Sequence, residues 1–224
     1  MPAELQTSRH HATLLLTLNG VNPVSLLQDD MHAAVIETLS TAESDRSLAA
    51  VVLTGLEDFA PAPDKSTVVP PLPEPLLEHL GDWVDALQSF PKPVLAAVDG
   101  RISGPGLALM LACDLVVAGR SSTMSASAMP EGGMSWFLAQ HLPRQFAMEL
   151  LTCPAPLPAA RWHALGAINR LVDDGTAHEV ALQWADELAV NAGRTDGIKS
   201  LLQEAAHHSL AQQLAAEAKY RLEN

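Results

Sequence analysis

Short apolar runs and an amphipathic helical segment alternate near the start of the chain, and this alternation restricts the fold more than any other feature. The run at 12–18 ends at the turn dipeptide Asn19-Gly20, and a second run occupies 48–53. Between them, apolar residues spaced three and four apart predict a helix over 26–39 with Ser25 as its N-cap. A strand, a crossover helix and a strand form a right-handed parallel unit. The sequence therefore predicts an α/β fold.

Further helices and strands follow the same pattern. A helix is predicted over 76–90, and a strand follows it at 94–98. Six prolines between 60 and 75 predict a long surface loop, because proline lacks an N–H and restricts φ. The remaining predicted elements are a buried helix over 107–113, a strand over 114–118, and helices over 144–151, 158–165, 177–192 and 195–221. We expect one core domain over 12–175 and a helical carboxyl-terminal region over 176–224.

Composition and charge exclude several classes of protein. The 224 residues are 48% hydrophobic, which is enough for one sizeable core. A formal charge of −13 argues against a nucleic-acid binder and against a polybasic membrane-surface protein. The first 11 residues carry no long apolar segment, and no stretch is long and apolar enough for a membrane span. Cys113 and Cys153 are too few for a disulfide framework, so we expect a soluble protein of the reducing cytoplasm.

Several short motifs occur in an order that is typical of one family. They are Val51-Val52-Leu53-Thr54-Gly55, Lys92-Pro93-Val94-Leu95-Ala96-Ala97-Val98-Asp99-Gly100, Gly104-Pro105-Gly106-Leu107-Ala108-Leu109, Ala112-Cys113-Asp114-Leu115, Met129-Pro130-Glu131 and Ala164-Leu165-Gly166-Ala167-Ile168-Asn169. Over residues 12–175 the chain resembles a divergent member of the enoyl-CoA hydratase/isomerase family, the crotonase superfamily.

The resemblance implies a fold, an assembly and a chemistry. The family fold is a spiral of ββα units followed by a helical region that forms trimers or dimers of trimers. The family site binds an acyl-CoA thioester and needs no further cofactor. Two backbone N–H groups stabilise the negative charge that develops on the thioester oxygen, and one or two carboxylates move protons or activate water.

Two prolines occupy the positions that correspond to the family's oxyanion donors. The first donor position falls on Pro63, in the run 59–64, and the second falls on Pro105. Proline has no N–H to donate. Loss of one donor typically costs about 10²- to 10³-fold in rate, so loss of both costs on the order of 5–8 kcal/mol if the effects add. The sequence therefore predicts a non-standard oxyanion site and very weak or absent hydratase activity.

One carboxylate of the family's pair is also missing. Its position is taken by Ala108, and the second position retains Glu131, which we expect to act as the general acid/base. The alternative is that Glu131 is a loop carboxylate that faces the solvent. The other residues expected at the pocket are Ala62, Asp64, Gly104, Gly106 and Trp136, with Asp64 at a position that usually caps the following helix.

Other departures from the family affect the surface that would contact CoA. The segment 132–137 is shorter and bulkier than the family's glycine-rich stretch, and Gly20-Val21 replaces a basic residue. The chain ends at Asn224, where the family continues through a final helix with a basic cluster. Together with the charge of −13, these departures predict weak recognition of the anionic CoA moiety.

The sequence predicts neither a metal site formed by histidines nor a catalytic serine nucleophile. Nine histidines are present, but His10-His11 and His207-His208 are adjacent pairs and no helical metal-binding spacing occurs, so we expect no metal site. His141 follows Glu131 and is a further residue that would line the pocket. Ser103 precedes the glycines of the second donor position, but no motif supplies it with a histidine or aspartate partner.

Three hypotheses for function remain open. In the first, the chain is an enzyme that acts on an acyl thioester or related carbonyl compound through Glu131. In the second, it is a catalytically degenerate homologue that serves as a binding or scaffolding subunit, as Pro63, Pro105 and Ala108 favour. In the third, the substrate is held on a carrier protein, although an acidic carrier would be repelled by a chain of this charge.

Overall fold

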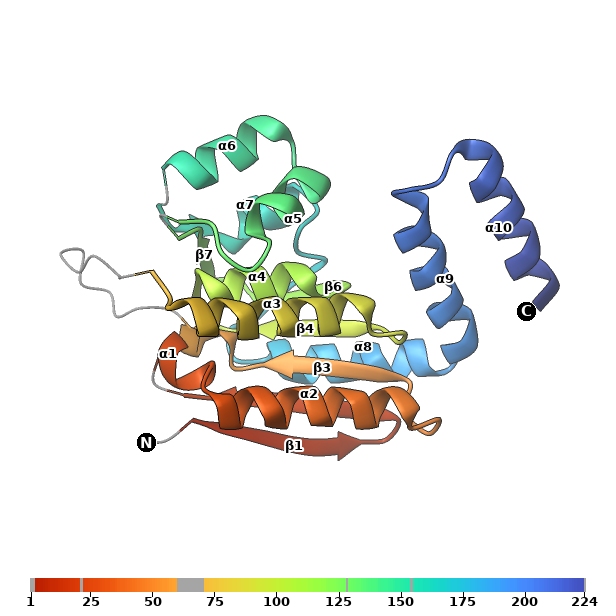
Figure 1. The fold of residues 1–224 in the computed structure, drawn as a ribbon, viewed down its shortest axis with the longest axis horizontal. Coiled ribbons are helices and arrows are strands. Elements are labelled where there is room, and N and C mark those ends of the chain that lie inside the picture. The colour runs from red at the N-terminus through yellow and green to blue at the C-terminus, as the bar shows by residue number, and fades with distance from the viewer. Residues whose placement is uncertain (1–2, 21, 60–70, 128, 154, 224) are drawn as a thin grey trace.

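The main sheet of the computed structural model has six strands. The structure describes residues 3–20, 22–59, 71–127, 129–153 and 155–223 (Figure 1). The strand order is β1-β2-β3-β4-β6-β9. The bounds are β1 Glu4–His10, β2 Thr13–Asn19, β3 Ala50–Thr54, β4 Val94–Val98, β6 Leu115–Gly119 and β9 Arg170–Val172. β1 and β2 form an antiparallel hairpin, and the other neighbours are parallel, so the predicted parallel unit is confirmed.

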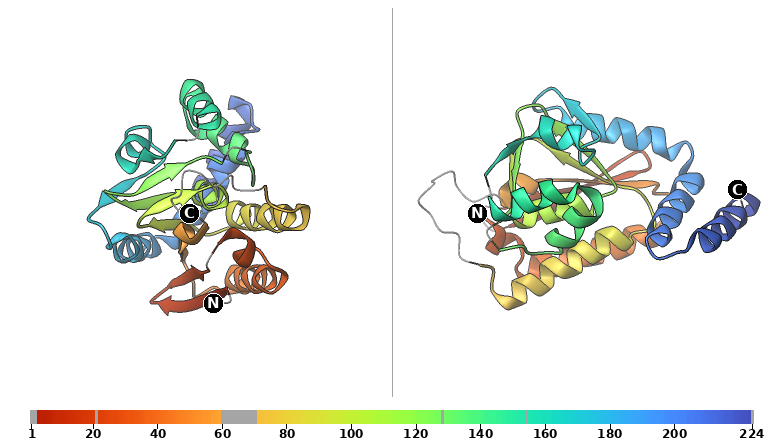
Figure 2. Two further views of the ribbon diagram at one scale, coloured as in Figure 1. Left: turned by 90° about the vertical axis from the view of Figure 1, so that its left-hand side faces the viewer. Right: turned by 90° about the horizontal axis from the view of Figure 1, so that it is seen from above.

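Within the described residues, a small second sheet and ten helices complete the fold. The second sheet has the order β5-β7-β8, with β5 Arg101–Ser103, β7 Thr123–Ser125 and β8 Leu157–Pro158. The helices are α1 Pro23–Leu26, α2 Asp29–Ser44, α3 Glu74–Ser89, α4 Pro105–Ala112, α5 Met134–His141, α6 Arg144–Thr152, α7 Ala159–Ala164, α8 Ala177–Ala189, α9 Ala192–Ala205 and α10 Leu210–Glu223, and η1 Leu56–Phe59 is a 3₁₀ turn. Helices α2 and α3 lie on one side of the main sheet and α8 on the other (Figure 2).

The central strands are buried on both faces. In β3, Val51 and Leu53 belong to the core beneath α2 and α3, while Ala50 and Val52 belong to the core beneath α8. Successive side chains of a strand point to opposite faces, so a strand covered on both sides reads as a continuous apolar run. The apolar runs in the sequence were therefore a reliable signal for these strands.

Small residues let α8 approach the sheet. Ala177, Ala181 and Ala185 recur every four residues and are fully buried on the inner face of α8. The start of α8 is held by Asp99, whose carboxylate accepts the N–H groups of Gly175 at 2.8 Å and Ala177 at 3.0 Å. Asp99 lies in the turn after β4, so this contact ties the helix to the sheet.

Three sequence expectations need correction. The helix expected over 26–39 is divided into α1 and α2, and Ser25 is not its N-cap. Asn22 caps α1 by accepting the N–H of Ser25 at 2.9 Å, whereas Gln28 precedes α2 without a side-chain cap. Pro75 lies in the first turn of α3, where a missing N–H costs little. The helix expected over 195–221 is two helices, α9 and α10.

The carboxyl-terminal helices extend from the body (Figure 1). α9 is anchored by Lys199, a buried side chain whose Nζ donates to Asp114 Oδ2 at 2.7 Å and to the carbonyl of Lys92 at 3.2 Å. α10 packs against α9, and the Tyr220 hydroxyl donates to the carbonyl of Arg194. None of the helices formed by the described residues is both long and apolar enough to cross a membrane.

Candidate active site

The start of α4 is a sharp turn from β5 into a buried helix. Gly104 has φ +52°, a value that favours glycine, and its carbonyl accepts the N–H groups of Leu107 at 3.0 Å and Ala108 at 3.2 Å. Pro105 is the first residue of α4, a position for which its fixed φ is suited. Pro105 is therefore compatible with the start of the helix, but it supplies no hydrogen-bond donor there.

Gly106 lies against η1 so closely that no side chain fits there. A Cβ on Gly106 would be 2.5 Å from the carbonyl oxygen of Leu56 and 3.0 Å from Cβ of Phe59. Its N–H is the first that α4 offers after Pro105, and no residue within the described ranges accepts it. The amino end of α4 thus presents one N–H together with the positive end of the helix dipole.

Two glycines place Glu131 next to α4. Gly132 and Gly133 have φ of +59° and +75°, and they turn the chain directly into α5. A Cβ on Gly132 would be 3.0 Å from Cβ of Ala108 and 2.9 Å from a methyl carbon of Leu80. The residue after Glu131 therefore packs on Ala108, which brings the segment of Glu131 against α4.

The Glu131 carboxyl is partly removed from water. Its Oε1 accepts the N–H of Leu72 at 3.4 Å, a long hydrogen bond, and the residue is half-buried. Burial raises the pKa of Glu131 above its ordinary value, because the charged form loses hydration, and the Leu72 N–H opposes this in part. A carboxyl with a raised pKa is better matched to proton transfer near neutral pH.

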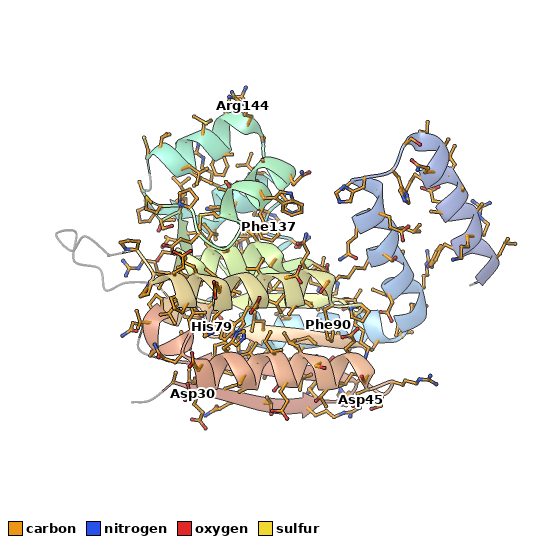
Figure 3. All side chains as sticks on the ribbon, viewed as in Figure 1. Asp30, Asp45, His79, Phe90, Phe137 and Arg144 are labelled. Carbon is orange, nitrogen blue, oxygen red and sulfur yellow. The ribbon has the colours of Figure 1, made fainter. Side chains whose placement is uncertain are left out.

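The other expected site residues are distributed as follows. Pro63, Ala62 and Asp64 lie outside the described residues. Trp136 is 44% exposed on α5, and its ring meets the edge of Phe137, which is buried where α5 packs on α4 (Figure 3). The ring of His141 stacks on Phe137, and burial lowers the pKa of His141.

Ser103, Leu72 and Leu80 lie near the site, and the family motifs assign no role to them. Ser103 is buried, and its hydroxyl has no hydrogen-bond partner within the part of the chain that the structure describes, so no triad forms around it there. Leu72 and Leu80 contact the Glu131 segment but were not singled out from the sequence. Leu80 has the periodicity of an ordinary core residue, and Leu72 lies within the proline-rich segment, between Pro71 and Pro73, without a motif of its own.

The parallel main sheet, the small second sheet and the carboxyl-terminal helices together define a crotonase-type fold. The chain belongs to the enoyl-CoA hydratase/isomerase family, whose model matches residues 9–223. It is 31% identical to the 1,2-epoxyphenylacetyl-CoA isomerase of Escherichia coli K12, over 93% of this chain and 85% of that protein. It is 29% identical to the 2,3-dehydroadipyl-CoA hydratase of the same organism, over 84% of this chain and 76% of that protein.

Solved structures agree with this assignment. An enoyl-CoA hydratase from Polaromonas sp. JS666 superposes with a TM-score of 0.83 at 33% identity, covering 98% of this chain and 91% of that chain. DspI of Pseudomonas aeruginosa shares the fold with a TM-score of 0.85 at 24% identity, covering 98% of this chain and 87% of that chain. The family resemblance and the fold class inferred from the motifs are thus confirmed.

Proposed function

We propose that this chain is an enzyme that moves a proton on an acyl-CoA thioester, with Glu131 as the general acid/base. The observation that carries the proposal is the position of Glu131. It is half-buried and has a raised pKa, and it directly precedes Gly132, which packs on Ala108 of α4. A surface carboxylate without a function would gain nothing from this burial, because burial penalises its charged form.

The single carboxylate favours isomerisation over hydration. Hydration requires one group to hold and activate the water while another delivers a proton, and Ala108 places a methyl group where the second carboxylate would be. One carboxylate can remove a proton from one carbon of an enoyl thioester, which leaves an enolate and a protonated carboxyl group, and can then return the proton to another carbon. The similarity to a 1,2-epoxyphenylacetyl-CoA isomerase supports this choice of reaction class.

The amino end of α4 supplies the remaining polarisation in this proposal. Pro105 cannot donate, but the N–H of Gly106 follows it at the positive end of the helix. A fixed backbone dipole stabilises an enolate oxygen without reorganisation, and a helix amino terminus favours a negative charge. One donor in place of two predicts a slower enzyme or a substrate that is easier to enolise.

Exchange of substrate hydrogen with solvent tests the proposal most directly. The chain is incubated in D₂O with a panel of enoyl-, aryl- and saturated acyl-CoA thioesters, and mass spectrometry follows the uptake of deuterium. We expect uptake next to the thioester carbonyl for at least one of them, because an enolate exchanges even when no product accumulates. Absence of both exchange and product over the whole panel would contradict the proposal.

Pro105 favours a second candidate, a scaffolding subunit that retains the fold without the reaction. A buried proline at the second donor position removes a group that ordinary oxyanion stabilisation needs. A scaffold would show no exchange in D₂O, and Glu131→Gln would leave its cellular function unchanged. Exchange that depends on Glu131 would eliminate this candidate.

The carboxyl-terminal helices are expected to mediate a trimer or a dimer of trimers. Leu202, Leu210 and Leu222 on α9 and α10 are 70%, 77% and 88% exposed, and apolar side chains so exposed on neighbouring helices favour association. Light scattering is expected to give the mass of three or six chains at micromolar concentration. A stable monomer under these conditions would contradict the expectation.

A further inference from the structure

Two histidines and an aspartate from distant parts of the chain converge at one surface position. His10 ends β1 and His11 begins the β1–β2 turn, while Asp186 lies on the last turns of α8. Asp186 Oδ2 is 3.5 Å from Nε2 of His10 and 3.0 Å from Nδ1 of His11. One nitrogen of each ring and one oxygen of the carboxylate all lie within 4.8 Å of one another.

The two separations between Asp186 and the histidine rings are close to an edge of a metal coordination polyhedron. Zinc is bound by histidine nitrogen at about 2.0–2.1 Å and by carboxylate oxygen at about 2.0–2.2 Å, so two ligand atoms of a tetrahedral site are about 3.3 Å apart. The distances from Asp186 Oδ2 to His10 and to His11, 3.5 and 3.0 Å, fall on either side of this value. Two imidazoles and one carboxylate are ligands that divalent zinc and its neighbours accept, whereas magnesium and calcium prefer oxygen alone.

The backbone at His11 is unfavourable for a histidine. His11 has φ +51°, and it is the one non-glycine residue with a positive φ among those the structure describes. Adjacent residues of a strand point to opposite faces, so two successive histidines would ordinarily diverge. The left-handed turn at His11 instead lets both rings reach Asp186. A conformation of this kind costs of order 1 kcal/mol or more for a residue with a Cβ. The two-residue hairpin turn between His10 and Thr13 requires it at its first residue.

Neighbouring contacts fix the turn in this conformation. Arg9 Nε donates to the carbonyl of His11 at 2.9 Å, and its other nitrogens donate to Asp45 and to Ser47. Asp45 lies at the carboxyl end of α2 (Figure 3). The turn is thereby held against α2 on one side and α8 on the other.

The cluster is separate from the candidate active site. The β1–β2 turn precedes β2, so it lies at the amino ends of the parallel strands β2, β3 and β4. Gly106 packs against η1, which follows the carboxyl end of β3, and Gly132, next to Glu131, packs on Ala108 of the same helix α4. A ligand at His10, His11 and Asp186 therefore does not take part in the chemistry of Glu131.

We propose that His10, His11 and Asp186 bind one divalent transition-metal ion of the zinc class. The ion joins the β1–β2 hairpin, at the edge of the main sheet, to α8, which covers one face of that sheet. Three protein ligands leave at least one coordination position for water, since structural zinc sites are closed by four ligands. The ion thus connects His11 to Asp186, which are 175 residues apart in the sequence.

Calorimetric titration of the untagged full chain with ZnCl₂ tests the proposal, with Co²⁺ absorption as a report on coordination. We expect one Zn²⁺ per chain and a Tm that rises by about 5 °C or more at 100-fold excess over Kd. Asp186→Asn keeps the shape of the side chain but removes its charge, and it is expected to weaken binding at least about tenfold. His11→Gly removes a ligand and relieves the left-handed backbone, so it is expected to lose binding while folding at least as well in metal-free buffer.

A matched control is provided by the second adjacent pair. His207→Asn and His208→Asn remove histidines that lie far along the chain, in the segment between α9 and α10. These variants are expected to bind Zn²⁺ as the parent does. Absence of binding by the parent chain would overturn the proposal and would mean that Asp186 only pairs with His10 and His11. Binding that survives Asp186→Asn and His11→Gly, or that is lost in the control variants, would overturn it as well.

Discussion

Glu131→Gln is expected to lower substrate turnover, and deuterium exchange with it, by about 10²- to 10⁴-fold. The amide has the shape of the carboxyl group but cannot accept and return a proton. Measurement is by the initial rate on whichever thioester of the panel exchanges best. Glu78→Gln on α3, an exposed glutamate, is the matched control and is expected to retain the parent rate.

The stability of the same variant separates a catalytic role from a structural one. Burial raises the pKa of Glu131 in the folded chain, so above that pKa the ionised group opposes folding. A neutral glutamine removes this opposition, and the Tm at neutral pH is expected to stay the same or rise slightly. A rate loss accompanied by a large fall in Tm would mean that Glu131 supports the loop rather than the reaction.

The decrease in activity at low pH should reflect the burial of Glu131. If ionised Glu131 is the base, activity falls as the pH is lowered through a pKa that lies above the ordinary glutamate value.

The strands that could be predicted are those buried on both faces. β3 and β4 appear in the sequence as continuous apolar runs because both sides of the sheet are covered. β1 was missed because it is an edge strand whose side chains are mostly exposed. β5, β7 and β9 have three residues each, too few for a periodicity to be visible. Ser25 was misassigned because Asn22, three residues earlier, offers the same kind of cap one turn sooner.

Residues of the candidate site could be predicted only where they belong to motifs whose order along the chain is typical of the family. Glu131 and Ala108 were singled out from their places in two motifs, and the structure brings their segments into contact through Gly132. The partner of Glu131, Leu72, contributes only a backbone N–H, which any residue except proline can supply. The convergence of His10, His11 and Asp186 could not be seen either, because it depends on how α8 lies on the sheet.

Hydration of crotonyl-CoA is expected to be absent, or at least about 10⁴-fold slower than in an ordinary hydratase. The motifs predict that Pro63 and Pro105 fall on both family donor positions and Ala108 on one carboxylate position, and each missing donor alone costs about 10²- to 10³-fold. Loss of the enoyl thioester absorbance measures the rate. Turnover in the usual enzymatic range, about 1 to 10³ per second, would show that the alignment of the two prolines with the donor positions is wrong.

Restoring the donors should show what the prolines do. In the variant that combines Pro63→Ala with Pro105→Gly, both positions regain an N–H, and thioester binding is expected to increase if the site is a blocked hydratase pocket. Pro143→Gly, at the start of α6, is the matched control, because it removes a proline from a helix start that carries no donor position. Hydration should remain slow even in the double variant, since Ala108 still lacks a carboxylate. A folded double variant with no gain in thioester binding would instead mean that the prolines shape the pocket for a different ligand, and the interpretation as a blocked site would have to be abandoned.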